Sequence, residues 1–168
     1  MKISVLFAFV FSLFSLQEGD LHRSQHFDKQ MFYKTMDSGN LLQVNDQFIS
    51  IKTLSVPDRN AYEGALLMKE ANLIQNKKIK LSLFKSGKLM LDSTIVNNNE
   101  NCEFRFLRLI IQENSPPFLG YNKQISEDCK VIKKKFDGVP VLLQNIIRDY
   151  SKKEKTTTCL FPEFLKNE

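Results

Sequence analysis

Glycine, proline and tryptophan are scarce in this chain, and their scarcity argues against a β-rich fold. The 168 residues include six glycines, five prolines and no tryptophan. A sandwich or a barrel needs many tight turns, which glycine and proline usually supply, so this composition favours helices. The glycines are also isolated and form no glycine-rich phosphate loop, so we expect no cofactor.

Histidine is almost absent, which limits metal-based and nucleophilic catalysis. His22 and His26 are the only two histidines, and they lie four residues apart. This spacing suits a metal, but no third ligand is evident, so we expect no metal site. A Ser-His-Asp or Cys-His mechanism would have to take its base from this N-terminal pair. We therefore expect no catalytic residue of that class.

The chain has three widely spaced cysteines, Cys102, Cys129 and Cys159, and no two of them form a C-x-x-C motif. This pattern gives no support for a zinc knuckle or a thioredoxin-like centre. In an oxidising compartment one disulfide could form by any of three pairings, leaving one free thiol. The simpler expectation is that at least two of the cysteines are small buried side chains without redox chemistry.

The chain lacks a concentrated basic surface of the kind that binds nucleic acid. Its net charge is +5, and the acidic residues are spread among the lysines. Five lysines between residues 77 and 88 resemble a basic stripe, but Leu81 and Phe84 fall on the same side of a helical wheel. We interpret this face as solvated, with lysine stems covering apolar side chains, although it could also be a patch for phosphate or lipid headgroups.

The N-terminus has the composition of a signal peptide. One lysine precedes an apolar run from Ile3 to Leu16, and the polar sequence QEGD follows directly. Fourteen residues are too few to cross a hydrocarbon core, which needs about 20 helical residues. We predict a signal peptide at residues 1–17, a helical domain at 18–151, and a polar linker with a short C-terminal tail at 152–168.

Apolar spacing predicts seven helices between the export segment and the tail. Fourteen phenylalanines and many aliphatic residues are available for a core that does not depend on disulfides. We expect Asp58 or Asn60 to cap the third helix and Ser126 to cap the sixth. Ala61, Gly64, Ala65 and Ala71 should allow a neighbouring backbone to approach the third helix closely. The expected helices span residues 24–37, 41–53, 61–74, 77–96, 103–115, 126–136 and 140–150.

Two segments resemble known helical families. The stretch LDSTIVNNNENCEFRFLRL is similar to the junction between tetratricopeptide helices, and AYEGALLMKEA is similar to a first repeat helix with small residues. This resemblance implies an all-α fold of about seven helices stacked as antiparallel pairs. AYEGALLMKEA followed by EFRFLRLIIQENSPPFLGYN and EDCKVIKK also resembles a family of small exported proteins from Bacteroidetes bacteria. That second resemblance implies export and a helical fold, and it transfers no active site.

The helix that begins at Glu103 carries the candidate site. Arg105, Arg108 and Gln112 form one narrow polar stripe on an otherwise apolar helix, and Glu113 falls on the apolar side. The stripe either holds an acidic group of a ligand or partner, or it pairs with neighbouring helices. Glu113 should need a cationic or backbone donor, because an unpaired buried charge is expensive.

Carboxylate chemistry is the remaining route to catalysis. Glu103, Glu113, Glu127 and Asp128 could converge as an acid and base pair. Glu127 and Asp128, however, lie in the first turn of a predicted helix, where they favour the positive end of its dipole. We prefer this capping role to a catalytic one.

These observations predict a non-enzymatic exported protein, periplasmic or extracellular, that binds or scaffolds a component of the cell envelope. We expect a monomer whose partner is another envelope protein, with no nucleic acid bound and no membrane span once the signal peptide is removed. The alternatives are a carboxylate-based enzyme and a membrane-anchored envelope protein.

Overall fold

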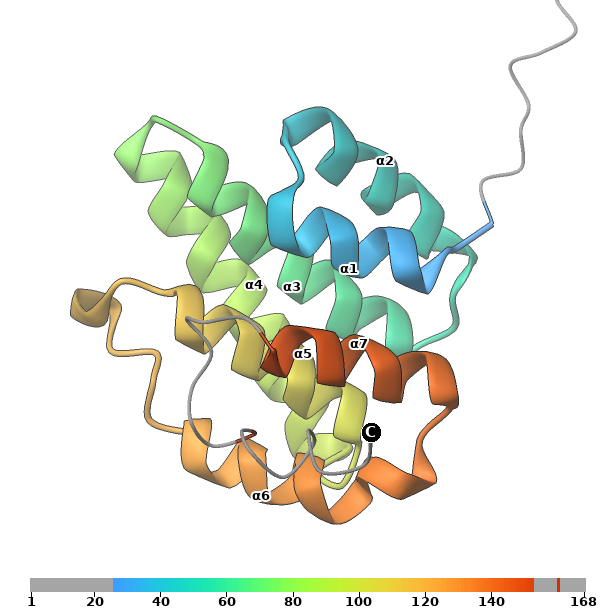
Figure 1. Cartoon of the computed structure of the whole chain (residues 1–168). Helices are drawn as coiled ribbons and strands as arrows, with labels where there is room; N and C mark the ends of the chain where they lie inside the picture. The colour runs from blue at the N-terminus through green and yellow to red at the C-terminus, as the bar shows by residue number, and fades with distance from the viewer. Residues whose placement is uncertain (1–25, 153–159, 161–168) are drawn as a thin grey trace, which may run out of the picture.

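A computed structural model describes residues 26–152 and residue 160 of the chain. Within these residues the protein is all-helical, with seven α-helices, three short 3₁₀ helices and no strand, which confirms the predicted fold class (Figure 1). The predicted signal peptide at 1–17 lies outside the described residues, and the repeat resemblance stays a prediction. In chain order the elements are α1 Lys29–Ser38, α2 Leu41–Ser50, η1 Ile51–Thr53, α3 Asp58–Leu73, α4 Lys77–Asn97, α5 Cys102–Asn114, η2 Pro117–Leu119, α6 Ile125–Lys135, η3 Phe136–Gly138 and α7 Val141–Ser151.

Side-chain caps define the start of four helices. Asp28, Asn40, Asn76 and Asn101 each accept hydrogen bonds from backbone N–H groups of the first turn that lack a helical partner. At α2 the cap is reciprocal, because the Gln43 side chain accepts from the Asn40 N–H at 2.9 Å. Three of these four caps are asparagines, at the starts of α2, α4 and α5.

The predicted caps of α3 and α6 are wrong. Helix α3 begins at Asp58, directly after Pro57, so Asp58 lies in the first turn and interacts with the positive end of the helix instead of capping it. Helix α6 begins at Ile125, one residue before Ser126. Its start is held by a tertiary contact, since the Gln124 N–H donates to the Gln112 side chain at 3.1 Å. Sequence-local cap signals could not reveal this contact.

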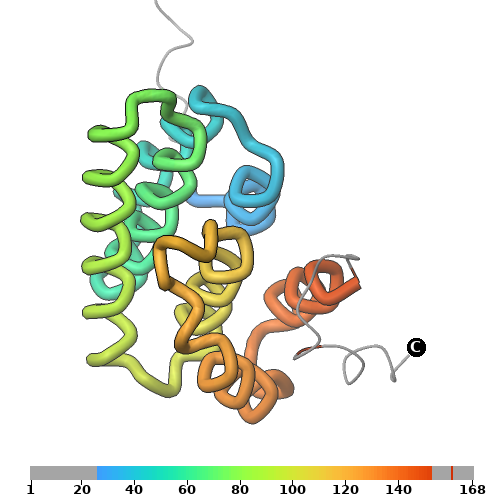
Figure 2. The backbone as a smooth tube through the Cα atoms, turned by 90° about the vertical axis from the view of Figure 1, so that its left-hand side faces the viewer, coloured from blue at the N-terminus to red at the C-terminus, as the bar shows by residue number. Residues whose placement is uncertain are grey.

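Helices α3 and α4 form the most extensive helix pair, and two glycines allow their close approach. Figure 2 shows α4 as the long helix along one side of the molecule. A Cβ added at Gly64 would lie 2.8 Å from the Gly87 carbonyl oxygen, and one added at Gly87 would lie 2.5 Å from the Gly64 oxygen. The expectation that small residues bring a backbone close to α3 is thus confirmed, with Ala61, Ala65 and Ala71 also buried.

Helix α5 lies in the centre of the molecule and packs against α3, α4 and α6 (Figure 1). It is buried at Cys102 and continuously from Phe104 to Gln112. The helix ends at Asn114, just before Pro116 and Pro117, as the proline pair predicts. Gly120 then turns the chain in the left-handed region, at φ 61°, which glycine adopts without strain.

The predicted C-terminal segment contributes Leu160 to the core. Leu160 has no exposed surface and belongs to the same buried cluster as the α5 side chains. The other residues of the predicted tail, beyond Lys152, lie outside the described part of the chain. Part of the segment proposed as linker and tail is therefore packed against the helical domain.

Cys129 is disulfide-bonded, whereas Cys102 is a buried free thiol. Burial, followed by the nearby charge of Glu103, raises the pKa of the Cys102 thiol to about 12. A disulfide uses two of the three cysteines, so the expectation that at least two remain simple buried thiols is wrong. Spacing along the sequence could not show which residues the fold brings together.

We expect Gly87→Ala to lower the free energy of unfolding by about 2 kcal/mol. The added methyl group would press against the backbone of α3, and this overpacking should outweigh the roughly 1 kcal/mol that alanine gains in helix propensity. Urea unfolding followed by circular dichroism measures the difference. Gly138→Ala is the control, since a Cβ there meets nothing within 4 Å and should change stability by less than about 0.5 kcal/mol. Equal stability of both variants would contradict the close crossing.

Candidate functional site

The predicted polar stripe of α5 converges on one carboxylate of α6. Arg105, Arg108 and Gln112 are buried, and Asp128 has no exposed surface at all. Arg108 makes a two-pronged contact with Asp128, through Nε at 2.8 Å and Nη2 at 2.6 Å. Arg105 Nη1 lies 3.0 Å from the same carboxylate, and Gln112 Nε2 donates to it at 2.7 Å. Both oxygens of Asp128 are thus satisfied inside the protein.

The network extends from Asp128 to α4 through Asp92. Arg108 Nη1 lies 3.2 Å from Asp92, which also accepts a hydrogen bond from the Tyr121 hydroxyl at 2.9 Å and pairs with Lys88 at 2.7 Å. Burial by itself would lower the pKa of Arg108, but the hydrogen bonds and charges of Asp128 and Asp92 outweigh it and raise that pKa. The guanidinium is therefore charged at every accessible pH, and the network joins α4, α5 and α6.

Arg105 also has partners outside Asp128. Its Nε donates to the Asn99 carbonyl oxygen at 2.9 Å, and its Nη1 lies 2.8 Å from Glu127, whose side chain is 62% exposed. Arg105, Arg108 and Gln112 of the predicted stripe therefore all donate hydrogen bonds to other groups of the same chain. The preferred capping role of Glu127 and Asp128 is incomplete, because both acids bind arginines across a helix interface.

Glu113, the fourth predicted site residue, lies apart from this network. It accepts a hydrogen bond from the Tyr150 hydroxyl of α7 at 2.5 Å. A tyrosine hydroxyl is thus one donor to this carboxylate. Burial, together with the Glu113 hydrogen bond and charge, raises the pKa of Tyr150.

Glu103, another candidate for acid–base chemistry, joins three helices. Its carboxylate lies 2.6 Å from Lys29 Nζ of α1 and accepts hydrogen bonds from the hydroxyls of Tyr33 at 3.2 Å and Tyr62 at 2.5 Å. Burial and the Glu103 charge raise the pKa of both tyrosines, so both hydroxyls stay protonated and act as donors. This cluster ties α1 and α3 to the start of α5.

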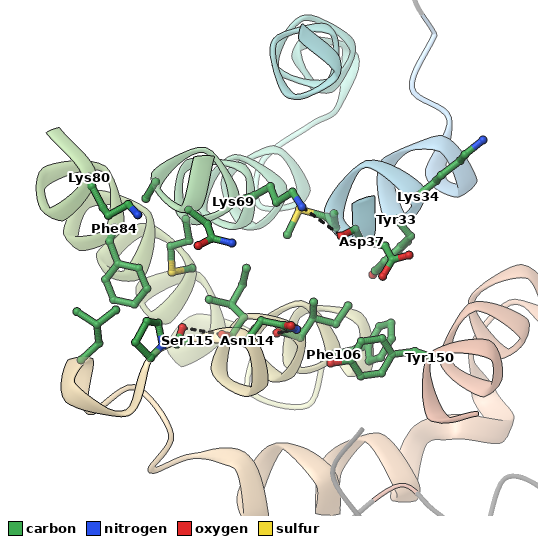
Figure 3. Close-up of a pocket in the computed structure, with 18 of the residues that line it drawn as sticks. Tyr33, Lys34, Asp37, Lys69, Lys80, Phe84, Phe106, Asn114, Ser115 and Tyr150 are labelled. Atoms are coloured by element: carbon green, nitrogen blue, oxygen red, sulfur yellow. Dashed lines mark hydrogen bonds between the residues drawn. The ribbon is translucent and has the colours of Figure 1, made fainter. Parts of the chain in front are cut away.

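A groove that the sequence did not single out is also present among the described residues. Its volume is about 970 Å³, and it lies between α1, α3 and α4 on one side and α5, η2 and α7 on the other (Figure 3). Its floor is apolar and comes from three helices. The buried floor residues are Met36 of α1, Met68 and Ala71 of α3, and Phe106, Ile110 and Ile111 of α5. Small-molecule sites typically have volumes of roughly 300–1,000 Å³ and linings of this apolar kind.

Charged residues line the groove unequally. Lys34, Lys69, Lys77 and Lys80 contribute four positive charges, against Asp37 and Asp149. Lys69 is partly buried and donates to the Asp37 carbonyl oxygen at 3.2 Å. Burial lowers the pKa of Lys69, and the Asp37 charge counteracts this only in part. In Figure 3 the Lys34 side chain points away from the groove.

The sequence analysis identified only the α4 side of the groove as a surface of interest. Lys77, Lys80, Leu81 and Phe84 of α4 all line it, and they belong to the face interpreted as solvated lysine stems. The remaining lining residues come from segments as far apart as Gln30 and Tyr150. None of the four predicted site residues lines the groove, since their side chains are directed to the networks described above.

Neither a metal cluster nor a membrane span is found in the part of the chain that the structure describes. No group of three or more His, Cys, Asp or Glu side chains in this part is arranged to hold a metal ion. None of the helices at 26–152 is both long enough and apolar enough to cross a bilayer.

Comparison with known proteins found no match for this chain. No protein-family model, no curated protein and no solved structure matches it. The chemistry of its own residues must therefore carry any functional conclusion.

We expect Asp128→Ala to lower the free energy of unfolding by roughly 3–5 kcal/mol, because it leaves two buried guanidinium groups without their shared carboxylate. Glu127→Ala is the matched control on the neighbouring residue. Its exposed side chain makes a single ion pair, so the cost should be about 0–1 kcal/mol. Chemical denaturation of both variants checks the difference, and an equally small loss for Asp128→Ala would show that the network does not hold α6 in place.

Proposed function

We propose that this chain is a non-enzymatic exported protein that binds an amphipathic ligand in the groove between α1, α3, α4, α5 and α7. The observation that carries the proposal is the groove itself. A volume of about 970 Å³ lies over an apolar floor and has lysines along its edge. Monomeric proteins rarely leave such apolar surface uncovered unless it binds something.

The state of the carboxylates supports binding over catalysis. Glu103 and Glu113 accept hydrogen bonds from tyrosine hydroxyls, and Glu127 and Asp128 pair with arginines. A general acid or base needs access to substrate as well as a suitable pKa. These four carboxylates are engaged at three separate places in the protein, and none of them lines the groove.

Two features support export to the periplasm or the outside of the cell. The first is the sequence of residues 1–17, with its charged start and apolar run. The second is the disulfide bond at Cys129, because such bonds persist mainly in oxidising compartments. Within that compartment the protein would carry its ligand as a monomer or deliver it to an envelope partner.

The neutral fluorescent probe N-phenyl-1-naphthylamine tests the groove. We expect its fluorescence to increase on binding, because the apolar floor excludes water from the dye. Asn72→Trp should weaken this binding at least about tenfold, or about 1.4 kcal/mol. Asn72 is an exposed residue that lines the groove, so an indole there fills space without disturbing the core.

Glu70→Trp is the matched control for this experiment. Glu70 lies on the same helix two residues earlier, and it does not line the groove. The control should bind the probe as the parent does, with circular dichroism confirming that both variants fold. No binding by the parent, or equal binding by both variants, would overturn the proposed function.

Export has a separate test at the N-terminus. N-terminal sequencing of the natural protein should find a first residue between Leu16 and Asp20, because a signal peptidase removes the apolar run. The expected first residue lies outside the described part of the chain. An intact Met1 in a cytosolic fraction would contradict export, and retention in membranes after carbonate extraction would favour an uncleaved anchor.

A further inference from the structure

Lys69 differs from the other lysines of the groove in its surroundings. It extends from α3 above the apolar floor, and Figure 3 shows its side chain between those of Lys80 and Asp37. Among the described residues, its ammonium group donates to one acceptor, the Asp37 carbonyl oxygen. An ammonium group can donate three hydrogen bonds, so Lys69 has capacity for a further acceptor.

The surroundings of Lys69 favour an anion over a neutral polar group. Partial burial removes water from the ammonium, which lowers the pKa of Lys69. An incoming negative charge would replace that lost hydration and interact more strongly than with an exposed lysine. The four lysines against two aspartates also give the groove a positive balance.

The residues that line the groove favour a ligand whose head group is small and carries a single negative charge. No arginine lies among the residues that line it. Arginine forks, which bind carboxylates and phosphates alike, are therefore absent, and lysine is the only cation available in the lining. A doubly charged phosphate usually needs several converging donors. Lys69 is the one partly buried lysine of the groove, since Lys34, Lys77 and Lys80 are exposed. A carboxylate matches a single partly buried ammonium better than a phosphate does.

The floor beside Lys69 fits an unbranched hydrocarbon chain. Methionine lines it on two helices, at Met36 and Met68, and the flexible thioether side chain adapts to irregular apolar shapes. Phe84 and Leu119 continue the apolar lining toward η2. Each methylene group buried there would therefore strengthen binding.

We propose that the groove binds a long-chain fatty acid, with the carboxylate on the Lys69 ammonium and the hydrocarbon chain on the apolar floor. This inference rests on the proposed function and names its ligand class. An acidic amphipathic peptide is the competing occupant. The volume of about 970 Å³ lies within the range of small-molecule sites, which favours the fatty acid.

Displacement of N-phenyl-1-naphthylamine by three amphiphiles of equal chain length, below their micelle concentrations, tests the head group. We expect palmitate to displace the dye at a concentration about tenfold lower than hexadecanol or hexadecyl phosphate. Equal displacement by palmitate and hexadecanol would overturn the role of the charge. Stronger displacement by hexadecyl phosphate would overturn the assignment of a carboxylate.

Substitutions locate the charge at Lys69. Lys69→Met should weaken palmitate binding about tenfold and change hexadecanol binding less than about twofold, while Lys69→Arg should retain most of the palmitate affinity. Lys34→Met is the matched control, because it removes the same charge from the same groove edge through a side chain that points away. Equal losses in Lys69→Met and Lys34→Met would overturn a direct contact.

The pH dependence gives a readout that a merely structural role of Lys69 would not produce. Because the pKa of Lys69 is lowered in the free protein, palmitate affinity should decline as pH rises, beginning below the ordinary range of a lysine. Hexadecanol affinity should stay constant over the same range. In Lys69→Arg the part of the decline below the ordinary lysine range should disappear, since arginine keeps its charge, and only the decline from Lys77 and Lys80 at higher pH should remain. A decline that still begins below that range in Lys69→Arg would contradict the inference.

The two proposals fail in different ways. Dye binding that Asn72→Trp abolishes, without preference for palmitate over hexadecanol, would overturn the fatty-acid inference and leave the proposed function standing. Displacement by an acidic amphipathic helical peptide but not by palmitate would overturn the fatty-acid inference in favour of a protein partner. Failure of the parent protein to bind any of these probes would overturn both.

Discussion

The contact between Asp128 and the two arginines of α5 is the constraint on which the structure depends. Arg105 and Arg108 are buried because they lie on the central helix α5. A buried charge without a partner would lower the free energy of unfolding by several kcal/mol. Asp128, which is fully buried near the start of α6, forms ion pairs with both guanidinium groups. Asp92 pairs with Arg108 and extends the network to α4. The rotation of α5 about its axis is thereby set, because its polar stripe must face α6 and α4.

The same rotation creates the groove. Phe106 and Ile110 lie on the side of α5 away from the arginines, and together with Ile111 they form part of the floor beneath α1 and α3. Glu103 and its tyrosine partners hold α1 and α3 against the start of α5. The helix thus carries an ion-pair network on one side and part of the apolar groove floor on the other.

The sequence predicted the helices well and the site poorly. Periodic apolar residues and asparagine caps are local signals, so α4 and the proline-terminated end of α5 agreed closely with expectation. The stripe at Arg105, Arg108 and Gln112 was recognisable, but its partner was not. Asp128 appeared as an ordinary acid in the first turn of a helix, because sequence carries no direct record of which helices touch.

The sequence by itself determined that the chain is helical, where most helices begin and end, and that α5 is buried on most sides. These properties follow from spacing, capping and composition, which act over a few residues. Only the tertiary structure decided that the arginine stripe is satisfied within the protein and that Lys69 lies over an apolar floor. Both results depend on contacts between segments far apart in the chain, as between Lys69 and Asp37 or Arg108 and Asp128, and such contacts exist only once the helices have packed.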